Sequence, residues 1–475
     1  MLKLLLFAAA LTASVVAHGA IAAGKPPNVI LILADDLGWT DLGCYGSDLY
    51  RSPNLDRLAA DGVRFTANYS ACTVCSPTRA ALLAGQYPAR LHVTDWIPGL
   101  PPGNPKLLVP DFTKHLPLEE TTLAELFQAA GYRTASIGKW HLGGEEYYPT
   151  KHGFDLNIAG DDSPQPKPGY FAPYAIKTME QGPAGEYITD RLGAEAAEFI
   201  RTAAGAGEPF FLYLPHFAVH TPIQAKRGLI QQHEAKVTPA LKHQNAAYGA
   251  MVQSMDQTVG RLRKLLKKLK IVDDTIIVFT SDNGGRIPTT SNAPLRFGKG
   301  SAYEGGVRVP LIIYAPGVTT AGSECDVPVI TMDLYPTIAQ LAGLLPPKDQ
   351  PLDGVSLVPL LDQSAKLAER DLFWHYPHYQ HYQQGGATPY GAIRRGDFKL
   401  IEFYADGRCE LYNVVDDIGE TKDLAPAMPE RVEELRQALD HWRHSVGAQM
   451  TRPNPAYDPS RPEDTRKSPQ NRASK

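Results

Sequence analysis

Two short acidic clusters each follow an apolar run of strand length. Asp35 and Asp36 come directly after the apolar run at residues 28–34, and Asp282 and Asn283 follow a second apolar run at residues 275–280. These side chains offer oxygen ligands only, which Ca²⁺ and Mg²⁺ prefer. Carboxylates brought together without a cation would raise one another's pKa values. We therefore predict one metal site built from both clusters; two ordinary polar turns are the alternative.

A cysteine stands at the start of a predicted helix. In the segment CSPTRAALLAG, residues 75–85, Pro77 suits the first helical turn and Gly85 ends the helix. Free N–H groups at a helix N-terminus favour a negative ligand or nucleophile, and Arg79 can hold a tetrahedral oxyanion by two hydrogen bonds. Cys75 is thus predicted to be a nucleophile or the precursor of a more reactive group, with a structural thiol as the alternative.

Two further apolar runs end near basic side chains. Residues 132–137 precede Lys139 and His141, and residues 209–215 precede His220. The carboxyl ends of parallel strands lie at one edge of a sheet, where such folds bind their ligands. We therefore expect these groups to converge with the acidic clusters, although a single histidine after a strand is more often structural.

The elements that must position these groups are four apolar runs that alternate with helical patterns. This arrangement indicates an α/β fold with a mostly parallel central sheet flanked by helices. Helices are predicted over residues 53–62 and 121–131, and a long amphipathic helix over 248–266. The basic tail at 261–270 is predicted to be a solvated outer face, with a membrane-binding face as the alternative.

The pattern changes near residue 365. Strands over 392–404 and 408–414 are predicted to form a hairpin, and one amphipathic helix runs from about 432 to 446. The residues after 450 are poor in large apolar groups, which is typical of disorder. A smaller C-terminal α+β subdomain is therefore expected beside the main sheet.

The N-terminus has the features of a secretory signal peptide: Lys3, an apolar stretch, and small residues at 20–22. Later stretches are too short or too polar to span a bilayer. We therefore expect an exported protein without stable membrane insertion. The net charge of −4 gives no electrostatic case for binding nucleic acid. The predicted organisation is a signal peptide (1–22), a catalytic domain (23–364), the C-terminal α+β subdomain (365–450) and a disordered tail (451–475).

The chain has five cysteines, an odd number. If Cys75 is the unpaired one, the other four allow three disulfide pairings. Several free, buried thiols are the alternative, and the sequence does not decide between them. The other four are Cys44, Cys72, Cys325 and Cys409.

Several stretches resemble the signatures of the type I, formylglycine-dependent sulfatases of the alkaline-phosphatase-like superfamily. Residues 75–85 are similar to the motif in which the cysteine is oxidised to formylglycine, and residues 131–141 to the second signature. Residues 219–222 and 298–310 match in order and spacing, as do the two acidic clusters. The resemblance extends over about residues 27–450 and is nearest to bacterial exported carbohydrate sulfatases and arylsulfatases.

The resemblance implies an alkaline-phosphatase-like fold, one bound Ca²⁺ rather than Mg²⁺, and a maturation enzyme that acts on Cys75. A hydrated formylglycine there would attack the sulfur of a sulfate monoester, and Asp282 would take the proton of the attacking hydroxyl. His220 is the candidate acid for the departing alkoxide and His141 the candidate base that releases sulfate. The implied metal ligands are Asp35, Asp36, Asp282, Asn283 and the residue at 75. The positive groups that would hold the sulfate oxygens are Arg79, Lys139 and Lys299.

Four residues of the C-terminal part are candidates for substrate binding: Trp374, His375, His378 and Arg394. Aromatic faces stack on sugar rings, and histidine or arginine can bind hydroxyls and further sulfates; an exposed loop cluster is the alternative. We therefore expect a sulfuric ester hydrolase whose substrate is a sulfated glycan or small molecule. A phosphodiesterase or phosphonate monoester hydrolase of the same superfamily, and a non-catalytic binder of sulfated glycans, are the alternatives. The sugar and the sulfated position stay open.

Overall fold

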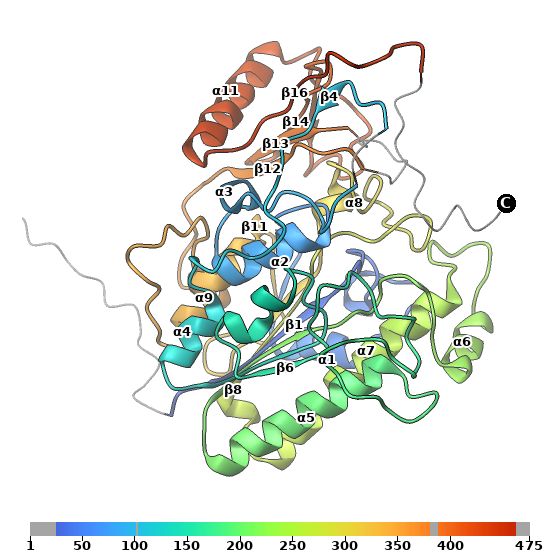
Figure 1. Ribbon diagram of the computed structural model, residues 1–475, viewed down its shortest axis with the longest axis vertical. Coiled ribbons are helices and arrows are strands. Elements are labelled where there is room, and N and C mark those ends of the chain that lie inside the picture. Colours follow the sequence, from blue (N-terminus) through green and yellow to red (C-terminus); the bar gives the residue numbers. More distant parts are fainter. Residues whose placement is uncertain (1–24, 101–102, 381–387, 462–475) are drawn as a thin grey trace, which may run out of the picture.

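The computed structural model describes residues 25–100, 103–380 and 388–461 (Figure 1). The predicted signal peptide, residues 1–22, lies outside these ranges. The large sheet has eight strands: β1 (Asn28–Ala34), β2 (Val63–Phe65), β5 (Arg133–Ile137), β6 (Leu156–Ile158), β7 (Phe210–Pro215), β8 (Thr275–Ser281), β9 (Leu311–Tyr314) and β10 (Ser323–Cys325). Their order across the sheet is β10-β2-β9-β8-β1-β7-β5-β6.

The sheet is mostly parallel, as predicted. Strands β8, β1, β7, β5 and β6 all run in one direction, and only β9 pairs antiparallel to its neighbours β8 and β2. The four apolar runs of the sequence form β1, β5, β7 and β8, which are consecutive in the sheet. Their carboxyl ends therefore lie side by side, although the runs are far apart in the chain.

Helices cover both faces of the sheet (Figure 1). Ile30 and Ile32 of β1 pack into one apolar cluster, and Val29, Leu31 and Leu33 pack into another on the opposite face. The first cluster includes α1 (Pro53–Asp61), α5 (Ile188–Ala206) and α7 (Ala246–Lys268), with α6 (Arg227–Glu234) packed beside it. The second includes α2 (Cys75–Ala84), α4 (Leu123–Ala129), α9 (Leu334–Leu341) and α10 (Val358–Leu361). Because both faces are covered, β1 is apolar at every position but its first.

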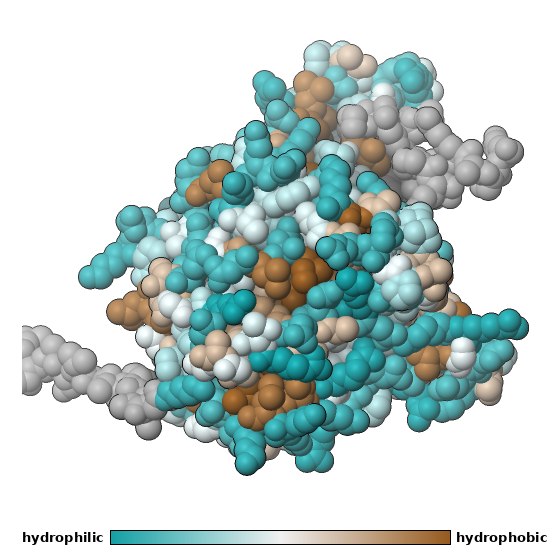
Figure 2. All heavy atoms as spheres, turned by 60° about the horizontal axis from the view of Figure 1, so that its bottom comes forward, coloured by the Kyte–Doolittle hydropathy of each residue, from teal (hydrophilic) through white to brown (hydrophobic). Residues whose placement is uncertain are grey.

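The basic end of α7 faces outward. Leu262 and Leu266 are buried in the core, whereas Lys264, Lys267 and Lys268 are exposed. This matches a solvated outer face on a packed helix. Figure 2 shows a face on which hydrophilic side chains dominate and hydrophobic ones form separate groups. In the part of the chain that the structure describes, no helix has both the length and the apolar character needed to cross a bilayer.

A second sheet forms the C-terminal domain, at the top of Figure 1. It contains β12 (Leu372–Tyr376), β13 (Tyr390–Arg395), β14 (Phe398–Phe403) and β15 (Cys409–Asn413), all antiparallel, and α11 (Pro429–Ser445) packs against it. The prediction of one strand over 392–404 was wrong. The chain reverses between β13 and β14 at Gly396, whose φ of 57° suits a tight turn.

The prediction that residues 451–475 are disordered was wrong for the first part of this segment. Arg452–Pro453 form β16, which pairs with β4 (Leu107–Leu108), and the side-chain amide of Asn104 donates to the carbonyl of Asp458 at 2.9 Å. Backbone pairing with a distant loop orders this segment despite its polar composition. The rest of that predicted tail, residues 462–475, lies outside the described residues.

All five cysteines are free in the structure. The alternative of free thiols is therefore the correct one, and none of the three possible pairings forms. The remaining short elements are α3 (Pro88–Leu91), α8 (Glu304–Val307), β3 (Asn68–Tyr69) and β11 (Val329–Ile330).

A buried charge network joins the two domains. Lys399 on β14 lies 3.0 Å from Glu304 of α8 and 3.2 Å from Glu420, and all three side chains are fully buried. Burial alone would lower the pKa of Lys399, but the two glutamates raise it above its usual value. The network also takes in Tyr69, whose hydroxyl donates to Glu304 at 2.7 Å. This network holds the segment that contains Lys299 in place on the C-terminal sheet.

Replacing Lys399 with methionine is expected to lower the free energy of unfolding by about 3 to 5 kcal/mol, because the buried Glu420 loses its ion-pair partner and Glu304 keeps only Arg308, at 3.3 Å. Urea unfolding curves of wild type and variant measure the loss. Lys422→Met, which removes an exposed lysine of the same domain, is the control and should change stability by less than about 0.5 kcal/mol. Equal effects of the two substitutions would contradict this account.

Candidate active site

The two acidic clusters lie together at the carboxyl ends of β1 and β8. These strands are neighbours, so the backbone N–H of Asp282 donates to the carbonyl of Ala34 at 3.1 Å. The N–H of Asp36 then reaches Oδ1 of Asp282 at 3.2 Å, and the amide of Asn283 donates to Oδ1 of Asp36 at 2.8 Å. Asp36 has a φ of 61°, an uncommon value that a functional site can impose. The side chains thus form one buried cluster.

This cluster fits a divalent cation. Oδ1 of Asp35 and Oδ1 of Asn283 are buried and have no hydrogen-bond partner among the described residues, and buried polar atoms are rarely left so. Burial and the neighbouring Asp35 raise the pKa of Asp282 to about 6. Crowded carboxylate and amide oxygens of this kind are the ligands of a hard cation.

Three positively charged side chains surround the carboxylates. Nε of Arg79 donates to Oδ2 of Asp282 at 2.9 Å, and Nη1 donates to the carbonyl of Lys139, also at 2.9 Å. Nζ of Lys139 lies 2.6 Å from Asp35, and Nζ of Lys299 lies 2.5 Å from Asp36. Burial raises the pKa of Asp36, but Lys299 and then His220 lower it well below its usual value. Such a concentration of positive charge suits a tetrahedral anion.

Cys75 is the first residue of α2 and is buried. Its Sγ lies 3.3 Å from Nδ1 of His141. Burial raises the pKa of the thiol, more than Lys139 and Lys299 lower it. The sequence-based expectation of a thiolate favoured by the helix N-terminus is therefore not supported, whereas a precursor of another nucleophile remains compatible with the site.

His141 is held by the backbone on its far side. Its Nε2 lies 2.5 Å from the carbonyl oxygen of Ile97, and its Nδ1 lies 3.2 Å from Oγ of Ser76. A carbonyl only accepts, so Nε2 carries the proton of this pair. Burial, together with Lys139, lowers the pKa of His141 well below its usual value. The ring is therefore neutral, with the lone pair of Nδ1 directed towards residue 75.

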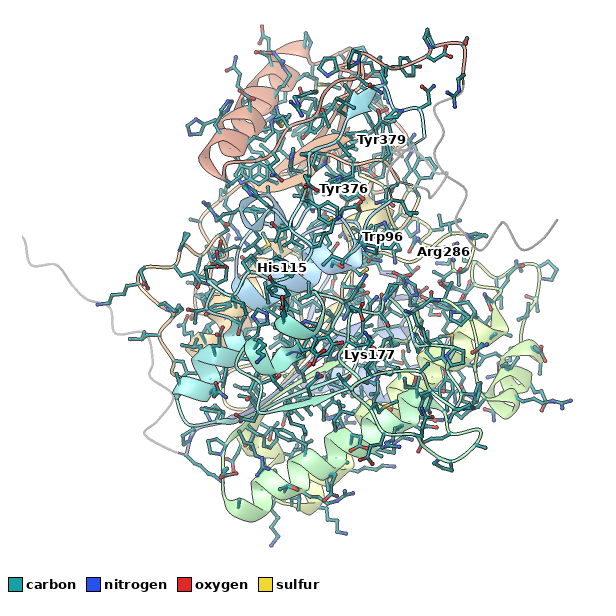
Figure 3. The ribbon with its side chains drawn as sticks, viewed as in Figure 1. Trp96, His115, Lys177, Arg286, Tyr376 and Tyr379 are labelled. Carbon is teal, nitrogen blue, oxygen red and sulfur yellow. The ribbon has the colours of Figure 1, made fainter. Side chains whose placement is uncertain are left out.

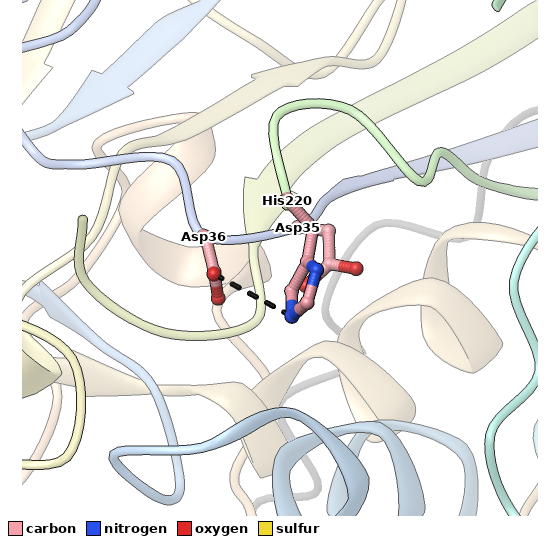
Figure 4. A group of neighbouring side chains, drawn as sticks. All are labelled: Asp35, Asp36 and His220. Carbon is pink, nitrogen blue, oxygen red and sulfur yellow. Dashed lines mark ion pairs between the residues drawn. The ribbon is translucent and has the colours of Figure 1, made fainter. Parts of the chain in front are cut away.

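His220 lies beside the acidic cluster (Figure 4). Its Nε2 is 3.8 Å from Oδ2 of Asp36, and its Nδ1 is 2.9 Å from the carbonyl of Thr221. One ligand atom from each of Asp35, Asp36 and His220 falls within 4.8 Å of the others. Burial lowers the pKa of His220 to about 3, so the ring is neutral. His220 thus stands at the edge of the predicted cation site.

The structure does not bring the four candidate substrate-binding residues to this cluster; all four are buried. Nε1 of Trp374 donates to the carbonyl of Ser70, His375 lies between Tyr404 and the carbonyl of Gln449, and His378 contacts Thr94. Arg394 donates to the hydroxyl of Tyr69. That prediction is therefore corrected: Trp374, His378 and Arg394 contact the large domain at the junction, whereas His375, on the opposite face of β12 from Trp374, packs inside the C-terminal domain.

Sequence reasoning missed two groups at the site. Ser76 contacts His141 through both Nδ1 and the backbone carbonyl, the latter at 3.0 Å, and its place next to Cys75 was an available signal. The carbonyl of Ile97 holds the other ring nitrogen of His141. A backbone carbonyl has no signature in the sequence.

Comparisons with known proteins give family models and relatives that match most of the chain. The family model described as Sulfatase matches residues 27–344, and the model described as N-sulphoglucosamine sulphohydrolase, C-terminal, matches residues 296–445. A sulfatase of Formosa agariphila is 36% identical over 483 residues, covering 86% of this chain and 86% of that protein. The N-acetylgalactosamine-6-sulfatase of Homo sapiens is 35% identical over 386 residues, covering 75% of this chain and 70% of that protein.

The fold is shared with solved structures as well. The crystal structure of Ps i-CgsB has a TM-score of 0.76 and 30% identity, and the match covers 88% of this chain and 93% of that one. Its complex with k-i-k-neocarrahexaose also gives 0.76 and 30%, with 92% and 96% coverage. Both the family model and the relatives span most of the chain. The chain therefore belongs to the sulfatase family, with its alkaline-phosphatase-like fold, and is an enzyme that hydrolyses sulfate esters.

Proposed function

We propose that this protein is an exported carbohydrate sulfatase that uses a formylglycine made from Cys75 and one bound Ca²⁺. The observation that carries the proposal is the meeting of residue 75, the oxygen cluster and the positive side chains at one sheet edge. Arg79 joins these groups, since its guanidinium contacts Asp282 and its helix begins at residue 75.

Asp35, Asp36, Asp282 and Asn283 would hold the cation, since their oxygens are crowded and two of them lack other partners. When present, formylglycine supplies a hydrated aldehyde for attack on sulfur, and Ca²⁺ lowers the pKa of the attacking hydroxyl. Lys139, Lys299 and Arg79 would bind the sulfate oxygens and stabilise the charge that develops on them. A maturation enzyme would have to oxidise Cys75 to formylglycine before the protein becomes active.

The two histidines have different proposed roles. His141 is neutral and offers the lone pair of Nδ1 to residue 75, at 3.3 Å from Sγ. It is thus suited to accept a proton from that residue when sulfate is released. His220 lies outside this contact, next to Asp36, and is the proposed donor of a proton to the leaving alcohol. Because its ring is neutral and its Nδ1 lies against the carbonyl of Thr221, Nε2 has to take up a proton before it can donate one. Each group would then act on a different bond.

A carbohydrate substrate is proposed from the named relatives. The human relative is an N-acetylgalactosamine-6-sulfatase, and Ps i-CgsB was solved in complex with k-i-k-neocarrahexaose. Both names point to sugars, and the first names a sulfate ester on a sugar. The predicted signal peptide, if cleaved, would place the enzyme where extracellular polysaccharides occur.

The test compares kcat/KM for release of inorganic sulfate from sulfated oligosaccharides with hydrolysis of bis(4-nitrophenyl) phosphate. We expect the best sulfated sugar to exceed the phosphodiester by about 100-fold or more. Both esters carry one negative charge, but the phosphodiester has a second ester group where the sulfate ester has a free oxygen for the positive side chains to bind. A clear preference for the phosphodiester would favour a phosphodiesterase of the same fold. Binding of sulfated sugars without turnover by protein with oxidised residue 75 would indicate a non-catalytic glycan binder.

A further inference from the structure

A hydrogen-bonded path runs from the C-terminal sheet to His141. Its outer end is Tyr376, the last residue of β12, and its inner end is the carbonyl of Ile97. Figure 3 shows Trp96 and Tyr376 at the junction between the large domain and the C-terminal sheet. From this path we infer that Tyr376 and Asp95 are positioning residues, which hold the imidazole of His141 against residue 75. The inference rests on the proposed role of His141.

The outer step joins the two domains. The Tyr376 hydroxyl donates to Oδ1 of Asp95, and the same oxygen accepts the N–H of Trp96 at 2.8 Å. The side-chain amide of Gln380 donates to the Tyr376 oxygen, which leaves the tyrosine proton for Asp95. Asp95 is only 3% exposed. A carboxylate buried to this degree is costly unless it accepts hydrogen bonds. The bond between Tyr376 and Asp95 therefore fixes the positions of both side chains.

The inner step joins this segment to the catalytic groups. The N–H of Ile97 donates to Oγ of Ser76 at 3.1 Å, and its carbonyl lies 2.5 Å from Nε2 of His141. One residue thus touches both the neighbour of residue 75 and the proposed base. The carbonyl of Ile97 sets which nitrogen of His141 carries the proton, and its N–H holds Ser76, which contacts the same ring.

Thr94, at the other end of the segment 94–97, also contacts the C-terminal domain. Oγ1 of Thr94 lies 2.8 Å from Nε2 of His378, which follows β12. Residues 94–97 are therefore placed between β12 and His141, and the bond between Tyr376 and Asp95 ties this segment to the last residue of β12 two residues before Ile97. Loss of that bond lets the carbonyl move, and a misplacement of about 1 Å at a catalytic group can cost about 100-fold in rate.

Tyr376→Phe removes only the hydroxyl and keeps the ring that stacks on Tyr390. We expect kcat for a sulfate ester to fall by about tenfold or more, with KM within about twofold of wild type. The matched control is Tyr404→Phe, which removes the hydroxyl of a half-buried tyrosine bonded to His375 at 2.7 Å. It alters the C-terminal domain without touching the path and should leave kcat unchanged. Equal losses in the two variants would overturn the inference.

Substitutions of Asp95 test the same path at the residue that accepts the bond from Tyr376. Asp95→Asn keeps an oxygen that accepts from Tyr376 and Trp96, and should retain more activity than Asp95→Ala. Because both residues act through one bond, the double variant Tyr376→Phe/Asp95→Ala should be no slower than Asp95→Ala alone. If the two losses multiply, the residues act independently and the path is wrong.

A spectroscopic readout separates this inference from the proposed function. In ¹⁵N-histidine-labelled enzyme, the His141 signals are identified by their loss in His141→Gln. We expect Nε2 protonation in wild type and in Tyr404→Phe, and a changed tautomer or exchange broadening in Tyr376→Phe. An unchanged His141 spectrum in Tyr376→Phe would reject the positioning role. A changed spectrum together with full activity of His141→Gln would instead reject the proposed role of His141.

Discussion

Cys75→Ala is expected to lower kcat for sulfate-ester hydrolysis by about 10⁴-fold or more, because alanine cannot become the nucleophile and the remaining groups only bind and orient. Binding should survive, since Arg79, Lys139 and Lys299 stay in place. Steady-state kinetics with 4-nitrophenyl sulfate measure the loss, and calorimetry with inorganic sulfate measures binding. Turnover near the wild-type rate would show that residue 75 is not the nucleophile.

Cys325→Ala is the matched control, since Cys325 is also buried and free but lies on β10, at the far edge of the sheet. It should keep full activity. Peptide mass spectrometry of wild-type enzyme completes the test. An aldehyde at residue 75, in a fraction that tracks specific activity, is expected, whereas a fully active preparation with only thiol at this position would contradict the proposal.

Removal of the metal is expected to lower kcat/KM by about 10³-fold, because the cation contributes several kcal/mol of charge stabilisation and activates the nucleophile. Dialysis against a chelator followed by elemental analysis gives the metal content beside the activity. We expect one Ca²⁺ per chain in active enzyme and recovery of activity when Ca²⁺ is added back. Full activity in protein shown to be free of metal would contradict this prediction.

Asp282→Asn gives the same test by mutation. The substitution removes a charge from the proposed ligand set and should lower both metal content and activity. The control is Asp256→Asn. Asp256 is also a buried carboxylate, but it accepts the N–H groups of Asn54 and Leu55 at the start of α1, each at 2.8 Å. This variant should lose some stability and keep its calcium.

The C-terminal part was the least predictable from sequence. Aromatic and basic residues there fit a sugar-binding surface as well as a packed junction, and composition does not distinguish them. The structure buries Trp374 and Arg394 at the junction of the two domains, where they contact Ser70 and Tyr69 of the large domain.

The sequence by itself predicted four of the eight strands of the central sheet, β1, β5, β7 and β8, the polar residues that follow them, and the family. These follow from local pattern, since a buried parallel strand is apolar along its length and its functional groups come directly after it. Only the tertiary structure decided the orientation and protonation of His141 and the burial of the supposed sugar-binding residues. Those depend on contacts such as Ile97 with His141 and Asp95 with Tyr376, which join distant parts of the chain. A hydrogen bond between such partners leaves no periodic trace in the sequence, because its geometry exists only once distant segments of the chain have packed together.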